Sequence, residues 1–171
     1  MAIASTTPGS RRALFARFRG GPEQFRPPWS RPEEAFQDAC NLCHACISAC
    51  PTGLLSKGHA GYPIADFSLA ACTLCGACVE ACESDCFVTP DSPAWGLKAT
   101  IATRCVEPKG VVCRMCEENC PAGAISFTPK LGGGTVPSVD PIRCTGCGAC
   151  VRPCPVHAVA MANSTHQERP S

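Results

Sequence analysis

The chain is poor in the side chains that normally build a protein core. Leu, Ile, Val and Phe together account for 31 of its 171 residues, about 18%, and aromatic residues for 6%. A highly charged chain with so few apolar residues would be expected to stay disordered, but the net charge here is only +1 at pH 7. Small domains with thin cores usually rely on disulfides or bound metals. We therefore expect a folded chain that is held together by something other than aliphatic packing.

The sequence also lacks a membrane span, an export signal and a strongly basic surface. No run approaches the ~18 apolar residues of a transmembrane helix, and the first residues contain no apolar segment like that of a secretory signal. The pair Arg11-Arg12 resembles a twin-arginine export motif, but charged residues and Pro27 interrupt the apolar segment that should follow. No nucleophile–base pair or nucleotide-binding loop is legible. We therefore expect a cytoplasmic protein that is not an enzyme, with no membrane span and no nucleic-acid partner.

Cysteine, by contrast, is abundant, with 17 residues or about 10% of the chain. A disulfide scaffold is the ordinary interpretation of so many cysteines. The odd number and the strictly repeated spacing favour metal ligands instead. Sixteen of the cysteines fall into four motifs, numbered here in chain order: Cys40, Cys43, Cys46 and Cys50; Cys72, Cys75, Cys78 and Cys82; Cys105, Cys113, Cys116 and Cys120; Cys144, Cys147, Cys150 and Cys154.

The spacing within the motifs indicates iron–sulfur clusters. Three motifs read Cys-x2-Cys-x2-Cys-x3-Cys, whereas seven residues separate Cys105 from Cys113 in the third. Pro follows the last cysteine of every motif except the second, where Glu83 stands. Three thiolates on one tight loop can reach three irons of a cubane, and in two-cluster bacterial ferredoxins the fourth cysteine ligates the other cluster. A zinc ribbon uses two separated Cys-x2-Cys pairs and no third cysteine. We therefore predict four 4Fe-4S clusters, with the sixteen motif cysteines as ligands.

Two pairings of the motifs are open at this point. If neighbouring motifs pair, the four ligand sets are Cys40, Cys43, Cys46 and Cys82; Cys72, Cys75, Cys78 and Cys50; Cys105, Cys113, Cys116 and Cys154; and Cys144, Cys147, Cys150 and Cys120. In a nested arrangement the first motif would pair with the fourth, and the second with the third. The spacing between motifs favours neighbours only weakly.

The segments between the motifs predict short β-hairpins. Residues 124–127 alternate small or polar with apolar side chains, three glycines then offer a turn, and residues 135–139 return toward the fourth motif. Residues 54–55 and 62–64 repeat this arrangement in the first half of the chain. A further strand is expected at residues 158–161.

These elements predict an α+β fold of two tandem bacterial-ferredoxin-like modules, with short hairpins and short helices around paired clusters. We place the modules near residues 36–92 and 98–163, with a linker at 89–93. Residues 1–35 carry Arg, Gly and Pro but no core pattern, so we expect a flexible basic N-terminal arm.

Two residues allow more than one interpretation. Cys86 lies outside the motifs, and it is either a spare ligand for a cluster that lacks the usual Pro or, more simply, a small apolar residue on a strand. His44 stands between two motif cysteines, where it could tune a cluster or contact a partner. We expect it to be a solvated loop residue, and because no histidine recurs in the repeat, a Rieske-type site is not supported.

With these residues in view, the chain closely resembles the NapF family of ferredoxin-type accessory proteins of periplasmic nitrate reductase. The resemblance runs from about residue 10 to residue 162. Besides the long spacing before Cys113, it rests on the segments Ser10-Arg11-Arg12, Arg26-Pro27-Pro28-Trp29, Gly61-Tyr62-Pro63 and Ala94-Trp95.

The resemblance implies a cytoplasmic protein with four 4Fe-4S clusters that contacts the catalytic molybdenum subunit before its export. It also implies a role in maturation of that subunit, through insertion or repair of its iron–sulfur cluster. The alternative is a soluble electron carrier that relays single electrons to a reductase. Residues 10–31, which are basic and end in aromatic and proline residues expected to be exposed, are a candidate docking element for a specific partner.

Overall fold

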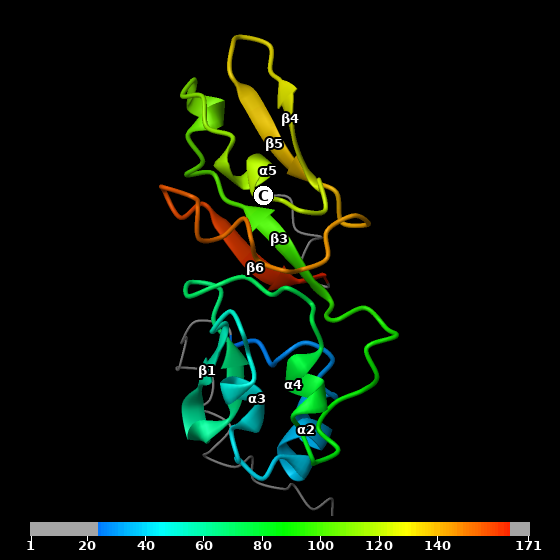
Figure 1. Ribbon diagram of the computed structural model, residues 1–171. Helices are drawn as coiled ribbons and strands as arrows, with labels where there is room; N and C mark the ends of the chain where they lie inside the picture. Colours follow the sequence, from blue (N-terminus) through cyan, green and yellow to red (C-terminus); the bar gives the residue numbers. More distant parts are fainter. Residues whose placement is uncertain (1–23, 165–171) are drawn as a thin grey trace, which may run out of the picture.

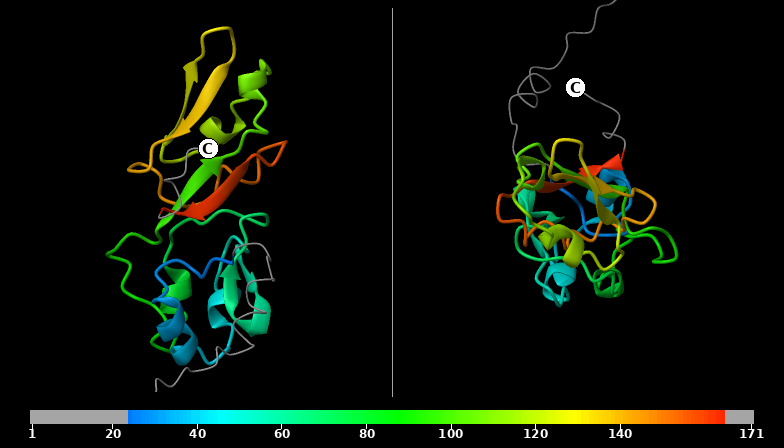
Figure 2. Two further views of the ribbon diagram at one scale, coloured as in Figure 1. Left: turned by 180° about the vertical axis from the view of Figure 1, so that it is seen from behind. Right: turned by 90° about the horizontal axis from the view of Figure 1, so that it is seen from above.

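The computed structural model describes residues 24–164, which form two modules stacked end to end (Figures 1 and 2). The first module contains α2 (Glu33–Ala39), α3 (Ala45–Ser48), β1 (Leu55–Lys57), the 3-10 turn η1 (His59–Gly61), β2 (Pro63–Ala65) and α4 (Ala77–Glu80). The second contains β3 (Leu97–Ile101), the 3-10 turn η2 (Glu107–Lys109), α5 (Met115–Glu118), β4 (Ile125–Pro129), β5 (Thr135–Val139) and β6 (Val159–Asn163). No helix within the described range is long and apolar enough to cross a lipid bilayer.

The strands form three two-stranded antiparallel sheets. The hairpin β1–β2 pairs Leu55 with Ala65, and the hairpin β4–β5 pairs Ile125 with Val139. Both confirm hairpins that the sequence predicts, and β6 confirms the strand expected near its end. The partner of β6 is β3, with Leu97 opposite Asn163. The sequence analysis missed β3, because its partner lies about sixty residues further along the chain and no local turn marks the pair.

The helices of the cysteine motifs are only four residues long, and the two in the first module start from a left-handed backbone residue. His44 (φ 62°) precedes α3, and Gly76 (φ 78°) precedes α4 at the equivalent position of the second motif. This conformation turns the chain sharply between the second and third cysteines, so that Cys46 and Cys78 both point into the module and are buried. Because such short helices are not stable alone, they depend on what their cysteines bind.

The aliphatic core is as thin as the composition predicts. The largest fully buried side chains among the described residues are Phe36, Leu54, Pro63 and Cys86. Most of the other buried side chains are small, and several motif cysteines are among them, including Cys116 and Cys150. The interior of each module is therefore lined largely by thiols.

The prediction of a flexible arm is wrong for residues 24–35. Phe25 forms a β-bridge with Ala65, Ser30 forms one with Phe87, and the side chain of Trp29 is only 6% exposed. The aromatic and proline residues that were expected to be exposed for docking are thus buried. Residues 1–23 lie outside the described range.

Arg26 fixes this segment to the first module. Its guanidinium forms an ion pair with Glu33 and lies over the rings of Phe36 (5.3 Å) and Tyr62 (5.0 Å). It also donates to the carbonyl oxygen of Pro63 at 3.2 Å. Cation–π contacts and isolated β-bridges leave no periodic pattern of apolar residues in a sequence. The sequence of this segment therefore gives no sign that it packs on the core.

The segment also fastens the connection between the modules. The backbone N–H of Trp29 donates to the carbonyl of Ala94 (2.7 Å), and its indole Nε1 donates to the carbonyl of Ser92 (2.8 Å). Trp95 packs against Phe67 with ring centroids 5.2 Å apart. The linker predicted at residues 89–93 is therefore bonded to the first module at Ser92, and the residues that follow it, Ala94 and Trp95, contact the same module.

Candidate iron–sulfur sites

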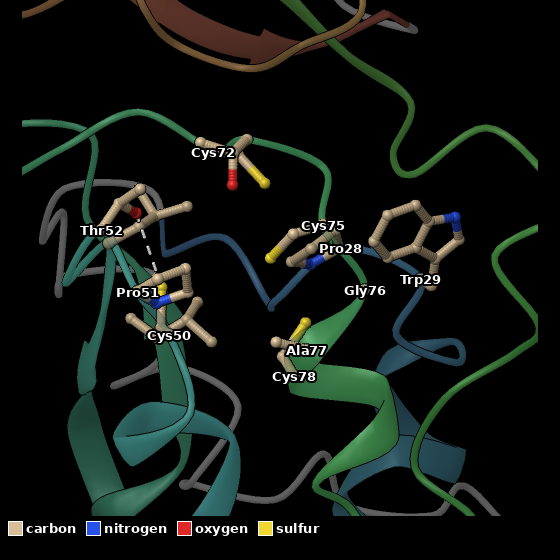
Figure 3. Close-up of a pocket in the computed structure, with 13 residues that line it drawn as sticks. Pro28, Trp29, Cys50, Pro51, Thr52, Cys72, Cys75, Gly76, Ala77 and Cys78 are labelled. Atoms are coloured by element: carbon tan, nitrogen blue, oxygen red, sulfur yellow. Dashed lines mark hydrogen bonds between the residues drawn. The ribbon is translucent and has the colours of Figure 1, made fainter.

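One group of four cysteines surrounds a cavity of the first module (Figure 3). Cys72, Cys75 and Cys78 come from the second motif, Cys50 is the last cysteine of the first, and their sulfur atoms point toward a common space. The cavity holds about 320 Å³ of space between atoms, part of it open to solvent. Trp29, with Pro28, covers one side of it.

The second module contains an equivalent cavity. It is lined by four thiols from the third and fourth motifs: Cys120, Cys144, Cys147 and Cys150. Its volume, about 300 Å³, is close to that of the first cavity, and Ala99 of β3 and Met161 of β6 complete its walls. The strand that the sequence analysis missed therefore forms part of a candidate site.

Each group is numbered after the motif that supplies three of its cysteines, so the two cavities belong to the second and fourth groups. Most of the remaining motif cysteines lie together in a first and a third group. Cys46 is close enough to Cys82, Cys40 and Cys43 to feel their charges. Cys116 interacts in the same way with Cys105 and Cys154. Together with the two cavities, these contacts join the first motif to the second and the third to the fourth. The described residues thus show the pairing of neighbours, and the nested arrangement is not present.

The inner thiols are hard to ionise without a cation beside them. Burial, and then the charges of neighbouring cysteines, raise the pKa of Cys46 and Cys116 to about 11 and that of Cys78 and Cys150 to about 12. A bound metal reverses this, because its positive charge favours the thiolate form. Binding and folding are therefore coupled at these positions.

Backbone N–H groups already point at several of the sulfur atoms. Leu74 donates to Cys72 Sγ at 3.3 Å, Ala124 to Cys120 Sγ at 3.3 Å, and Ala158 to Cys154 Sγ at 3.1 Å. Such bonds stabilise thiolates and tune the reduction potential of a cluster that they hold.

The thiols fit a cluster rather than a single ion. Within residues 24–164, no set of three or more His, Cys, Asp or Glu side chains converges closely enough to hold one metal ion. A zinc site would need four ligands around one atom, at Zn–S distances of about 2.3 Å. Four cysteines spread around a cavity instead match a group with several irons, each bound by one thiolate.

Glu107 supports the third group, and the sequence analysis did not single it out. It lies in the long spacing before Cys113 and is only 3% exposed. Its carboxylate accepts hydrogen bonds from the Cys113 backbone N–H (2.7 Å) and the Thr135 hydroxyl, and it pairs with Arg114 (3.1 Å). These contacts, the Thr135 bond first, lower the pKa of Glu107. The sequence feature that could have pointed to Glu107 is an acidic residue within the unusually long loop between two ligand cysteines.

Cys86 and His44 both occupy packed positions. Cys86 is 2% exposed and lies beside Cys82 and Cys40, and burial raises its pKa to about 12. Cys86 therefore touches two thiols of the first group without belonging to a motif. His44 is not a solvated loop residue as predicted, because its Nε2 lies 2.9 Å from the Gly61 carbonyl and the side chain is half-buried.

The fold and its thiol groups are those of an iron–sulfur protein built from two tandem ferredoxin-like modules. In agreement, the 4Fe-4S dicluster domain matches residues 39–87 and again residues 109–158, which implies 4Fe-4S clusters as cofactors.

Relatives narrow the family. The chain is 44% identical over 143 residues to the ferredoxin-type protein NapF of Haemophilus influenzae, covering 84% of this chain and 81% of that protein. It is 40% identical over 151 residues to NapF of Escherichia coli K12, covering 88% and 92%. The methylamine utilization ferredoxin-type protein MauM of Paracoccus denitrificans is 32% identical over 155 residues, covering 75% and 66%. This chain belongs to the NapF family of ferredoxin-type proteins.

Removal of iron should unfold the protein. With so thin an aliphatic core and four-residue helices, the chain without clusters has little to hold its interior together. We expect iron chelation under anaerobic conditions to abolish most of the far-ultraviolet circular dichroism, and reconstitution with iron and sulfide to restore it. A native-like spectrum after complete removal of iron would contradict this.

Cys86 should be dispensable as a ligand, whereas Cys82 should not. We expect Cys82→Ala to lose one cluster, which lowers the iron content from about 16 to about 12 atoms per chain. Cys86→Ala, a matched change at the neighbouring thiol, should keep all of the iron, because the motif cysteines Cys40, Cys43, Cys46 and Cys82 already supply four ligands. The measurement is the content of iron and acid-labile sulfide per chain. Loss of iron from Cys86→Ala but not from Cys82→Ala would show that Cys86 is the ligand.

Glu107 should be needed for the third cluster. We expect Glu107→Gln to weaken the Cys113 loop, so that the protein loses up to about four irons per chain on exposure to mild chelation. Glu118→Gln, the same change at an exposed carboxylate of α5, is the control and should lose none. Because the pKa of Glu107 is lowered, its support is present above the ordinary carboxyl pKa and is lost only as the pH falls below it. Equal iron loss from both variants would disprove the role.

Proposed function

We propose that this protein holds four 4Fe-4S clusters on its sixteen motif cysteines and acts as a maturation factor of periplasmic nitrate reductase. In this role it binds the catalytic molybdenum subunit in the cytoplasm and assists the insertion or repair of that subunit's iron–sulfur cluster before export. The observation that carries the proposal is the similarity to NapF proteins over 84–88% of the chain, together with four cysteine motifs in its sequence.

The chemistry of the four groups suits such a role. A 4Fe-4S cluster supplies one-electron transfer. The thiols hold it, the N–H groups aimed at their sulfur atoms adjust its potential, and the Trp29 cover restricts the access of water to the second group. Within this proposal the protein is not an enzyme by itself.

The second candidate function is a soluble electron carrier that passes single electrons to a reductase. The observation that favours it is the direct contact between the modules, where the cysteine loops of the second and fourth groups meet. A factor that only delivers clusters does not need its modules to touch at their ligand loops.

The state of the catalytic subunit distinguishes the two functions. We expect the catalytic subunit purified from cells that lack this protein to contain less iron than normal, and to be inactive even with an artificial electron donor. A subunit with its full cofactor content that is active with the artificial donor would contradict maturation and favour electron transfer.

Complementation of those cells tests whether the N-terminal segment is the docking element. Because residues 24–31 belong to the folded module, the informative truncation removes only residues 1–23. If docking depends on the basic residues there, the chain that starts at residue 24 should keep its iron but fail to restore the catalytic subunit. Full restoration by this chain would place the docking surface within residues 24–171.

A further inference from the structure

The two modules meet at the ligand loops of the second and fourth groups. The backbone N–H of Cys72 donates to the carbonyl oxygen of Cys147 at 2.8 Å. Cys72 is the first cysteine of the second motif, and Cys147 is the second cysteine of the fourth. A single hydrogen bond therefore joins the walls of the two cavities described above.

This contact is tightly packed. Gly148, the residue after Cys147, has φ +75°, and a Cβ placed on it would lie 2.1 Å from Cδ1 of Phe67 in the first module. Phe67 is 7% exposed and packs between Phe25 and Trp95, at ring-centroid distances of 5.9 and 5.2 Å. The backbone of the fourth loop is therefore pressed against an immobilised ring, with no room for water or for a side chain on Gly148.

A cation also lies against the fourth ligand loop. Lys98 of β3 donates from its Nζ to the carbonyl oxygen of Cys144 at 2.6 Å, and the side chain is half-buried. A positive charge next to a cluster site favours its reduced, more negative form. Electrons are therefore stabilised in the middle of the molecule.

The first and third groups lie away from this boundary. Within each module the two groups are neighbours because every motif contributes to both: Cys116 and Cys120 belong to different groups, although they are only four residues apart. Cys46 and Cys78 similarly interact across the first module. Each outer group thus has one neighbouring group, in its own module, while each inner group has two.

We propose that the boundary contact joins the clusters into one electron path in the order first, second, fourth, third. This inference rests on the ligand assignment of the proposed function. Each step moves one electron from a reduced cluster to its oxidised neighbour. A one-electron reductant at one end and a one-electron acceptor at the other complete the balance. Electrons then enter and leave at the far ends of the two modules, next to the first and third groups.

Two chains that each keep two clusters test the order. The inner-pair chain, C43A/C46A/C113A/C116A, keeps the second and fourth groups, whereas the outer-pair chain, C75A/C78A/C147A/C150A, keeps the first and third. Both should contain about eight irons. After reduction with dithionite, electron paramagnetic resonance should show a spectrum broadened by spin–spin interaction for the inner pair. The outer pair should give two independent signals, because dipolar coupling falls with the cube of distance.

The outcomes separate the two proposals. More than about eight irons in either chain, which means that a cluster survives the loss of its assigned cysteines, would overturn the ligand assignment. About eight irons in both chains, with uncoupled spectra for the inner pair or equal coupling in both, would overturn the path alone. Should either chain fail to hold its clusters, the four-cluster protein answers the same question through two glycine variants.

Gly148→Ala and Gly76→Ala form a matched pair for this purpose. Both glycines follow the second cysteine of a motif and have nearly the same φ (+75° and +78°), so alanine strains both loops alike. Only at Gly148 does the added Cβ collide with Phe67. At Gly76 its nearest neighbour is Pro90 Cγ at 3.9 Å. We expect Gly148→Ala to weaken the coupling between modules at full iron content, and Gly76→Ala to preserve it. Unchanged coupling in Gly148→Ala would contradict the path.

Discussion

The structure depends on each cysteine motif contributing its last cysteine to the group that the neighbouring motif forms. Cys50 completes the group formed by the second motif, and Cys120 completes the group formed by the fourth. A single motif therefore never encloses a cavity, and two motifs must approach before either one can bind. The hairpins β1–β2 and β4–β5 bring them together, because each hairpin follows one motif and returns the chain to the next. Metal binding replaces the aliphatic core that the composition lacks.

The elements that the sequence predicts are those specified locally. Alternation over a few residues and a glycine turn specify the hairpin β4–β5, and fixed spacing specifies the cysteine loops. Even the unusual gap between Cys105 and Cys113 leaves Cys105 in its group, because the extra residues form η2 and pack on β5 through the Glu107–Thr135 bond. Cysteine spacing did not decide between neighbouring and nested pairing of the motifs, because the pairing is set by the hairpins that connect them.

The features that the sequence does not reveal are contacts between distant segments. Strand β3 is recognisable only opposite β6, and Trp29 acts as a cover only once the first module has brought Cys72 and Cys75 beneath it. The arm looked coreless because its anchors are single contacts, such as Arg26 over Tyr62, rather than a periodic face. Glu107 was similarly hidden, because its three partners come together only in the folded loop.

Equivalent positions of the repeated cysteine motifs have different neighbours in the structure. Gly76 and Gly148 occupy the same place in their motifs and have the same backbone conformation, yet only Gly148 faces a ring of the other module. The duplication of the motif explains the shared conformation, but it does not explain the contact. Two independent ferredoxin modules joined by a linker would leave this face polar. Phe67, Trp95 and the Cys72–Cys147 hydrogen bond instead fix the two modules against each other at this point. Because tunnelling between redox centres weakens steeply with distance, the electron path proposed above depends on this contact to join the two modules into one redox unit.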